Sequence, residues 1–153
     1  MDDFTPVVTS HNDVSGYDVG LCIQTQHADV RDNEVHDTCI GAFIDPGIAA
    51  TVRFNHVAGT NGACADQNEF GITGITVSGS NAVVQHNRIG GIVGDDSAGI
   101  LVVDFPESPP ATGNLVSRNT LTGNTLDLLV TATSGDNVVV RNRCTSSEPD
   151  GLC

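Results

Sequence analysis

The sequence has no lysine, no tryptophan and few aromatic residues, which make up 4% of the chain. A core without large aromatic rings must be built from Val, Ile, Leu and Ala, and this suits a narrow stack of β-branched residues better than a helical bundle. Six arginines stand against 19 acidic residues, which leaves a formal net charge of −13. This balance argues against nucleic acid or an anionic membrane as a partner and favours solubility or cation binding.

Long apolar runs and helical periodicity are missing as well. No stretch of about 18 apolar residues occurs, so the sequence predicts no membrane-spanning segment. Residues 1–8 contain neither the basic region nor the apolar core of a signal peptide. Gly, Pro and Asn interrupt every window that is long enough for a helix. The length of 153 residues fits one domain, which we expect to cover 1–153.

A short phrase recurs six times, each time around an asparagine. An aliphatic residue or Cys follows the Asn by two positions in every copy, and Val precedes it by three in five copies. The copies are 21, 22, 32, 32 and 23 residues apart, and a period near 22 with two longer turns is typical of a solenoid. An amide at one fixed place in every coil predicts a stacked ladder. We expect a C-terminal tail at 144–153 and coils centred on Asn12, Asn33, Asn55, Asn87, Asn119 and Asn142.

A second aliphatic segment follows each Asn phrase, and a third short strand precedes it. In the second segment alternate residues are apolar, for example Ala42 and Ile44, or Ile75 and Val77. Alternation of this kind is expected of a strand whose one face points into a core. Each coil is therefore predicted to hold three short strands joined by tight turns.

The pattern Val-x-x-Asn-x-Val, followed by a turn and Gly-Ile-x-Val, resembles the repeat of the pectate-lyase-like superfamily from about Thr9 to Cys144. The resemblance implies an all-β fold, a right-handed parallel β-helix of five to six coils with an internal Asn ladder. It also implies which segments form the first strand, whose outer face carries the substrate groove: those that begin at Gly20, Gly41, Gly74, Gly99 and Asp127. The superfamily includes polysaccharide lyases, glycoside hydrolases and non-catalytic surface proteins, so the fold alone does not define an activity.

The distance from each ladder Asn to the next groove strand locates insertions. It is eight residues in coils one, two and five, but nineteen in coil three and twelve in coil four. Extra residues therefore lie at 60–71 and 93–97, before the groove strand, and a further insertion at 104–113 follows it. These loops flank one strip of sheet and predict a cleft, where loops on a rigid scaffold can bind a ligand. Alternatively, the insertions have no function, since solenoids tolerate them.

The predicted cleft is acidic, and its acids are Asp45, Asp66, Glu69, Asp95, Asp96, Asp104 and Glu107. Paired carboxylates can act as acid and base in glycoside cleavage. We therefore expect as candidate catalytic residues Asp95, Asp96, Asp45 and Asp104, and as candidate substrate-binding residues Phe43, Ser78, Glu69 and Asp66. Closely spaced carboxylates could instead hold Ca²⁺, although no defined metal site is predicted. The remaining alternative is ordinary solvated surface charge.

Two smaller patterns have competing interpretations. The pair Asp95–Asp96 resembles the double Asp of polygalacturonase-type hydrolases, but neither a Gly-His-Gly nor an Arg-Ile-Lys motif accompanies it. On the outer face of the strand that follows the ladder, Glu34, His36 and His56 could lie within reach of proton transfer. Exposed cross-strand salt bridges of small value are the other interpretation of that cluster.

Five cysteines in so short a chain favour an oxidising compartment. Cys144 and Cys153 could close the tail over the last coil, and Cys39 could pair with Cys64 from the corresponding turn of the next coil, which leaves Cys22 over. Five buried thiols are the alternative. We expect a secreted or cell-surface protein whose signal peptide is not present in this chain.

Two functions are compatible with these observations. The first is a carbohydrate-active enzyme, a lyase or glycoside hydrolase that acts on polysaccharide in the acidic cleft. The second is a non-catalytic surface, glycan-binding or structural module. In both cases the expected partner is a polysaccharide or glycan surface, with no nucleic acid and no membrane. The absence of a capping helix before the first coil predicts a covered end, missing coils or an oligomer interface there.

Overall fold

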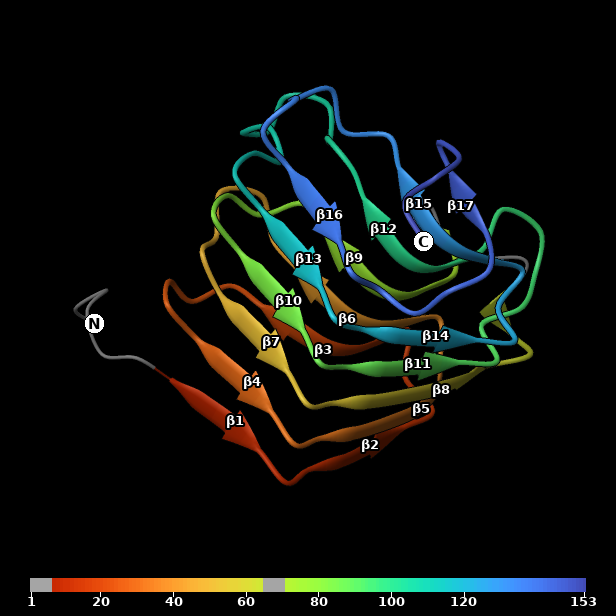
Figure 1. The fold of residues 1–153 in the computed structure, drawn as a ribbon. Coiled ribbons are helices and arrows are strands. Elements are labelled where there is room, and N and C mark those ends of the chain that lie inside the picture. The colour runs from red at the N-terminus through yellow and green to blue at the C-terminus, as the bar shows by residue number, and fades with distance from the viewer. Residues whose placement is uncertain (1–6, 65–70) are drawn as a thin grey trace.

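The computed structural model describes residues 7–64 and 71–153 and shows a right-handed parallel β-helix, as the sequence predicts (Figure 1). Every pair of neighbouring strands is parallel. Sheet A has the order β1(Val8–Ser10)–β4(Asp29–Arg31)–β7(Thr51–Arg53)–β10(Val83–Gln85)–β13(Leu115–Ser117)–β16(Val138–Val140). Sheet B has the order β2(Asp13–Ser15)–β5(Glu34–Thr38)–β8(His56–Thr60)–β11(Arg88–Gly90)–β14(Thr120–Thr122). Sheet C has the order β3(Val19–Ile23)–β6(Ile40–Ile44)–β9(Thr73–Val77)–β12(Ala98–Val102)–β15(Leu126–Val130)–β17(Ser147–Glu148).

Each coil takes one strand from each sheet in the order A, B, C. The first five coils are complete, from β1–β2–β3 to β13–β14–β15, and β16 and β17 belong to a sixth. The ladder Asn lies between the strands of sheets A and B in every coil, and sheet C corresponds to the predicted groove strands. No helix among the described residues is long and apolar enough to cross a membrane.

The core is a set of aliphatic stacks that run along the axis of the helix. The predicted inward positions of sheet C are buried in the central coils, where Ile44, Ile75 and Ile100 are fully inaccessible. Corresponding stacks line sheets A and B, and they consist of Val30, Val52, Val84 and Val116, and of Val35, Val57, Ile89 and Leu121. β-Branched and aliphatic side chains fill this narrow space without any aromatic ring, in agreement with the composition.

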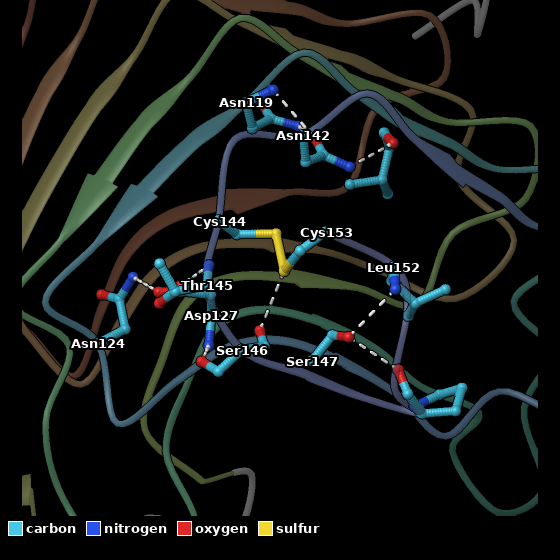
Figure 2. Close-up of a disulfide and its surroundings, with 12 residues drawn as sticks. Asn119, Asn124, Asp127, Asn142, Cys144, Thr145, Ser146, Ser147, Leu152 and Cys153 are labelled. Atoms are coloured by element: carbon cyan, nitrogen blue, oxygen red, sulfur yellow. Dashed lines mark hydrogen bonds between the residues drawn. A yellow bond between two sulfur atoms is a disulfide. The ribbon is translucent and has the colours of Figure 1, made fainter.

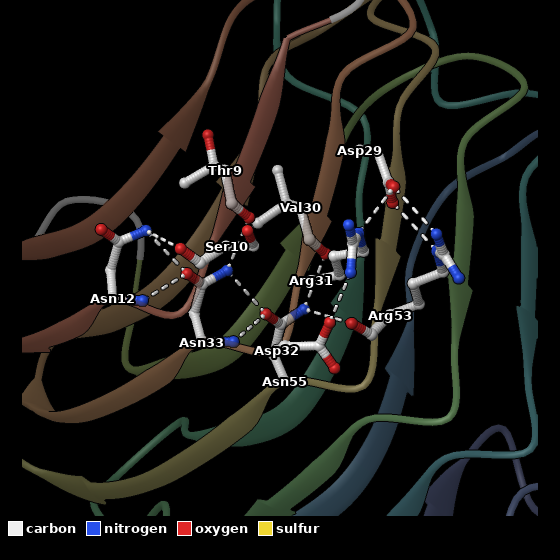
Figure 3. A network of polar contacts seen from close by, with 10 residues as sticks. All are labelled: Thr9, Ser10, Asn12, Asp29, Val30, Arg31, Asp32, Asn33, Arg53 and Asn55. Atoms are coloured by element: carbon white, nitrogen blue, oxygen red, sulfur yellow. Dashed lines mark hydrogen bonds and ion pairs between the residues drawn. The ribbon is translucent and has the colours of Figure 1, made fainter.

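The asparagines form a continuous ladder. The Nδ2 of Asn33 donates to Oδ1 of Asn55 at 2.9 Å and to the carbonyl oxygen of Thr9 at 3.0 Å, while its backbone N–H donates to the same Oδ1 at 3.0 Å (Figure 3). The equivalent bonds join Asn55 to Asn87, Asn87 to Asn119 and Asn119 to Asn142. The buried amides of Asn33, Asn55, Asn87 and Asn119 therefore have partners in the coils on both sides, and that of Asn142 has partners in coil five.

Glycine occupies the second position of four sheet C strands because the coils approach closely there. An added Cβ on Gly41 would lie 2.5 Å from the carbonyl oxygen of Gly74, and one on Gly74 would lie 2.5 Å from that of Gly99. No real Cβ contact is that short, so only glycine fits. In β15 the position belongs to Asp127, whose carboxylate accepts hydrogen bonds from the backbone N–H and hydroxyl of Thr145 in the tail (Figure 2).

A second, shorter ladder lies between sheets C and A, and the repeat analysis missed it. The Nδ2 of Asn114 donates to Oδ1 of Asn137 at 2.9 Å, and the backbone N–H of Ala82 donates to Oδ1 of Asn114 at 2.8 Å. The carbonyl oxygens of Gly79 and Ala111 accept the remaining amide protons. This ladder escaped notice because only two coils carry Asn at that position.

Both expected disulfides are present. Cys39 and Cys64 join coils two and three, with Cα atoms 5.4 Å apart, and Cys144 and Cys153 close the tail over the last coil (Figure 2). Cys22 is free and exposed, which also agrees with the prediction. Two disulfides in a chain of this size indicate an oxidising environment.

Candidate functional site

The insertions lie at opposite ends of the central strands of sheet C. Residues 61–72 connect β8 to β9 and residues 91–97 connect β11 to β12, so both precede a sheet C strand. Residues 103–114 connect β12 to β13 and follow it. The spacing between the ladder residues and the groove strands therefore correctly predicted which connections between strands are longer.

A hollow of about 620 Å³ lies between the loops that precede β9 and β12. Its polar lining includes Thr60, Asn61, Asp95 and Asp96, and Ile72 and Val93 contribute apolar surface. Two carboxylates, a hydroxyl and an amide thus face one open space. Asp95 and Asp96 are exposed, whereas the sequence analysis had not selected Thr60 or Asn61, although both lie where the long insertion begins.

Neighbouring coils hold the wall of this hollow in place. The backbone N–H of Val93 donates to Oγ1 of Thr60 at 3.1 Å, and that of Gly94 donates to Oγ1 of Thr125 at 3.3 Å. The hydroxyl of Ser97 donates to the carbonyl oxygen of Gly94 at 2.8 Å. Asp96 adopts a left-handed backbone conformation with φ of 55°, and Cys64 in the opposite wall is anchored by its disulfide. The two carboxylates are therefore presented from a supported turn.

At the other end of β12, Asp104 is engaged in the structure of its own loop. One oxygen accepts the backbone N–H of Ala111 at 2.8 Å, and the other accepts the backbone N–H and the hydroxyl of Thr133, both at 2.8 Å. The bond from the Thr133 backbone is the main reason why the pKa of Asp104 is lowered from its ordinary value. A carboxylate that is held ionised in this way can fix segment 104–113 in place, and it is poorly suited to donate a proton.

Asp45 is also bonded within the sheet. Its Oδ2 accepts Nε2 of Gln24 at 2.7 Å, and its Oδ1 lies 3.8 Å from the Sγ of Cys22. Burial, and then the charge of Asp45, raises the pKa of the Cys22 thiol. These three residues form one polar cluster at the end of sheet C, with Cys22 and Gln24 in coil one and Asp45 in coil two.

The four candidate catalytic acids are divided between the two ends of the sheet C strands. Asp95 and Asp96 precede β12, whereas Asp104 follows it, and the strand between them has five residues. At about 3.3 Å per residue the strand alone separates its ends by roughly 13 Å, whereas paired glycosidase carboxylates lie about 5–9.5 Å apart. Asp45 lies at the same end as Asp104. A catalytic pair that combines the two ends of the strand is thus geometrically excluded.

The structure differs from the predicted cleft, because the floor of the cleft is covered. Ser78, a candidate substrate-binding residue, is only 1% exposed, and Thr76 in β9 is 0% exposed. The hydroxyl of Ser78 donates to the carbonyl oxygen of Ile44 at 2.5 Å and is used within the sheet. Segment 104–113 folds back across coil three, where Ser80 donates to the carbonyl oxygen of Pro110.

The same segment reaches coil two. The ring of Phe105 lies against that of Phe43 with centroids 5.7 Å apart, so Phe43 is half-buried instead of open to a sugar. Asp66 and Glu69, the other candidate substrate-binding residues, lie outside the described residues. Among residues 7–64 and 71–153, no group of three or more His, Cys, Asp or Glu is placed to hold a metal ion. Ca²⁺ binding therefore stays a prediction without a site.

The predicted Glu34–His36–His56 cluster separates into two groups, because His36 contacts other acids than His56 does. His56 Nδ1 lies 3.8 Å from Glu34 Oε1, but His36 contacts Asp37 at 3.0 Å and Asp13 at 3.1 Å. The hydrogen bond to Asp37, followed by that to Asp13, raises the pKa of His36. The arrangement agrees with the alternative of exposed salt bridges.

Comparison of the chain with protein-family models, with curated proteins and with solved structures gave no match. The β-helix is observed. Membership of the pectate-lyase-like superfamily stays a prediction, because the repeat that suggested it is evidence for the coiled fold and not for common ancestry.

Proposed function

We propose that this protein is a secreted or cell-surface β-helix that binds polysaccharide in the hollow beside β9 and β12 without cleaving it. The observation that carries the proposal is the lining of that hollow, which Asp95 and Asp96 share with Thr60 and Asn61. Carboxylates, amides and hydroxyls are the groups that pair with sugar hydroxyls, and here they project from loops on a rigid scaffold. The two disulfides support an extracellular location, since such bonds persist in oxidising compartments.

The separation of the described acids supports binding without cleavage. Two-carboxylate hydrolysis needs an acid and a second carboxylate on opposite sides of one glycosidic bond. Among the described residues, the hollow contains only the adjacent Asp95 and Asp96, while Asp45 and Asp104 are bonded at the far end of sheet C. A glycoside hydrolase that uses Asp95 and Asp96 as its pair is the second candidate, favoured by their location in the same hollow.

The test is a panel of neutral and acidic polysaccharides assayed for binding by calorimetry and for cleavage by reducing ends and unsaturated products. The variants are Asp95→Asn, Asp96→Asn and, as a matched control on the exposed tail, Asp150→Asn. We expect binding without products, and an affinity loss of about tenfold in the two hollow variants, the effect of losing one charged hydrogen bond of about 1.5 kcal/mol. The control should bind as the wild type does.

Other outcomes select between the candidates. Product formation that both Asp→Asn substitutions abolish would establish the hydrolase. Binding that neither substitution weakens would move the glycan site away from this hollow. A panel with neither binding nor products would overturn both candidates.

A further inference from the structure

Four of the six arginines of this acidic chain lie at one corner of the helix. They are Arg88, Arg118, Arg141 and Arg143, and all four are exposed. The corner is the turn between sheets A and B, on the outside of the Asn ladder. We call this surface the arginine corner, and it includes Phe54, His86, Thr120 and Thr122, which line a hollow of about 580 Å³ together with three of the arginines.

The ladder turn itself aligns these side chains. The residue before each ladder Asn has a left-handed backbone with φ between 56° and 57° in Phe54, His86, Arg118 and Arg141. The register of sheet A places these four on successive coils. The residue after each ladder Asn lies at the start of the strand of sheet B. There Arg88 is the backbone register partner of Thr120, and Thr120 is that of Arg143. Two rows of side chains thus run parallel to the helix axis, with coils about 4.8 Å apart.

The positive charge of the corner is not neutralised within the protein. Among the described residues, the arginine ion pairs belong to Arg31 and Arg53, which contact Asp29 and Asp32 on sheet A. None of the four corner arginines has an acidic partner within 4 Å in that part of the chain, and no acid lines the hollow. In a protein with a net charge of −13, a cluster of unpaired arginines marks a site for anions.

An exposed aromatic platform adjoins the arginines. Phe54 is 49% exposed, and its ring stacks on that of His86 with centroids 5.1 Å apart and planes 13° from parallel. The guanidinium of Arg53 lies 5.7 Å from the centroid of the same ring, and the part of the ring that stays exposed can contact the apolar face of a sugar ring. The hydroxyls of Thr120 and Thr122 lie beside it in the same hollow. Cation, aromatic face and hydroxyl together match the carboxylate, ring and hydroxyls of a uronic acid.

We propose that the arginine corner binds an acidic polysaccharide through its uronate carboxylates, with the chain parallel to the helix axis. The coil spacing of about 4.8 Å is close to the length of one pyranose unit, so successive carboxylates can meet arginines on successive coils. Arg118 and Arg141 lie one coil apart, and Arg88 and Arg143 two coils apart. The guanidinium fork pairs with a carboxylate by two hydrogen bonds.

Nucleic acid fits this surface less well. Duplex DNA carries one negative charge per about 1.7 Å of its axis, a density that four arginines over three coils do not match. The rest of the protein would repel such a polymer through its net charge of −13. A polyuronate has only one charge per sugar. This site lies on a different face from the hollow of Asp95 and Asp96, and it does not depend on the function proposed for that hollow.

The test measures binding of polygalacturonate by calorimetry, with dextran as the neutral polysaccharide and a thymidine oligonucleotide as the alternative polyanion. The variants are Arg118→Gln, Arg143→Gln and the double Arg88→Gln/Arg118→Gln. Arg31→Gln is the charge-matched control on sheet A, and thermal melts verify the fold of each variant. We expect binding that weakens between about 50 and 200 mM salt, a loss of about tenfold for each single variant, a larger loss for the double variant and no loss for Arg31→Gln.

Dextran should not bind at the arginine corner, so any affinity for dextran should be the same in the double variant as in the wild type. The proposal is overturned if polygalacturonate does not bind at low salt, if the double variant binds as the wild type does, or if the oligonucleotide binds more tightly. It is also overturned if the arginines instead serve self-association, so that Arg88→Gln/Arg118→Gln lowers the mass in solution. Asp95→Asn and Asp96→Asn should leave polygalacturonate affinity at the corner undiminished, which separates a failure here from a failure of the other hollow.

Discussion

The side-chain amide of Asn55 donates to Oδ1 of Asn87 at 3.0 Å, although 32 residues separate them. Asn33 donates to Asn55 at 2.9 Å across only 22 residues. The extra residues of the longer coils therefore leave the ladder geometry unchanged. Insertions are confined to the connections at the ends of sheet C, and the backbone hydrogen bonds between coils keep their register.

We expect Asn55→Ala to lower the free energy of unfolding by about 1–3 kcal/mol. The substitution leaves the backbone N–H and Nδ2 of Asn33 without the acceptor that Asn55 Oδ1 provides. Urea unfolding followed by circular dichroism measures the loss. Asn12→Ala is the matched control at the exposed end of the ladder, and its effect should be smaller. Equal stability of wild type and Asn55→Ala would contradict a structural role for the ladder.

Gly74→Ala should destabilise the protein by about 1–3 kcal/mol, the range typical of overpacking. The new methyl group would lie 2.5 Å from both the carbonyl oxygen of Gly99 and the Cγ2 of Ile89. Gly62→Ala is the control, because nothing lies within 4 Å of an added Cβ at Gly62. The midpoints of thermal unfolding of the two variants make the comparison. If they coincide, coil spacing at the glycine row is looser than the structure indicates.

Stability should fall steeply in acid, below the ordinary Asp pKa of 3.8. The hydroxyls of Ser134 and Thr112 lower the pKa of Asp136 to about 2, and the bond from Arg53 lowers that of Asp29. A carboxyl group with a depressed pKa in the folded state stabilises the protein above its unfolded pKa, and this stabilisation is lost as pH falls through the folded value. Urea midpoints at pH 5, 4, 3 and 2 (roughly spanning both values) test this.

A double substitution identifies the groups responsible. In Asp29→Asn/Asp136→Asn the acid-dependent part of the stability should shrink, because two of the depressed carboxyl groups no longer titrate. Glu107→Gln removes an exposed acid on segment 104–113 and should leave the pH profile as it is. If the urea midpoint of the wild type does not change over this pH range, the assignment of the acid sensitivity to these carboxyl groups is refuted.

Reduction should lower the midpoint of thermal unfolding. Cys39 and Cys64 close a loop of 25 residues, and a cross-link of that length stabilises a protein by about 3 kcal/mol in the chain-entropy model. Cys39→Ala/Cys64→Ala should reproduce most of the effect of a reducing agent, whereas Cys144→Ala/Cys153→Ala, with a separation of 9 residues, should have less effect. Cys22→Ser serves as the control. A midpoint that does not respond to reductant would contradict this prediction.

The fold could be predicted because its information is local and repeated. Val at one position, Asn three residues later and an aliphatic residue two beyond it recur in phase with the coil, and each coil must present the same atoms to its neighbours. The missed ladder of Asn114 and Asn137 shows the limit of that reasoning, since two copies do not make a visible period. The disulfide between Cys39 and Cys64 could also be predicted, because equivalent turns of adjacent coils lie side by side.

The candidate site could be predicted only in part. Counting from the ladder located the loops and selected Asp95 and Asp96, which do line a hollow. It did not show that Asp104 accepts three hydrogen bonds from its own loop and the next coil, or that Ser78 is buried. The direction in which a loop folds depends on contacts with distant coils, and no pattern of neighbouring residues encodes it.

By itself the sequence determined the β-helix, its register and the position of its insertions, because hydrogen bonding between stacked coils demands a strict repeat. Only the tertiary structure decided which polar side chains share a surface. It placed Phe105 against Phe43 and so closed the expected groove. It also brought two arginines of adjacent coils into one hollow: Arg88, which follows one ladder Asn, and Arg118, which precedes the next ladder Asn. Such encounters arise from the coiling of the chain, which makes neighbours of residues far apart in sequence.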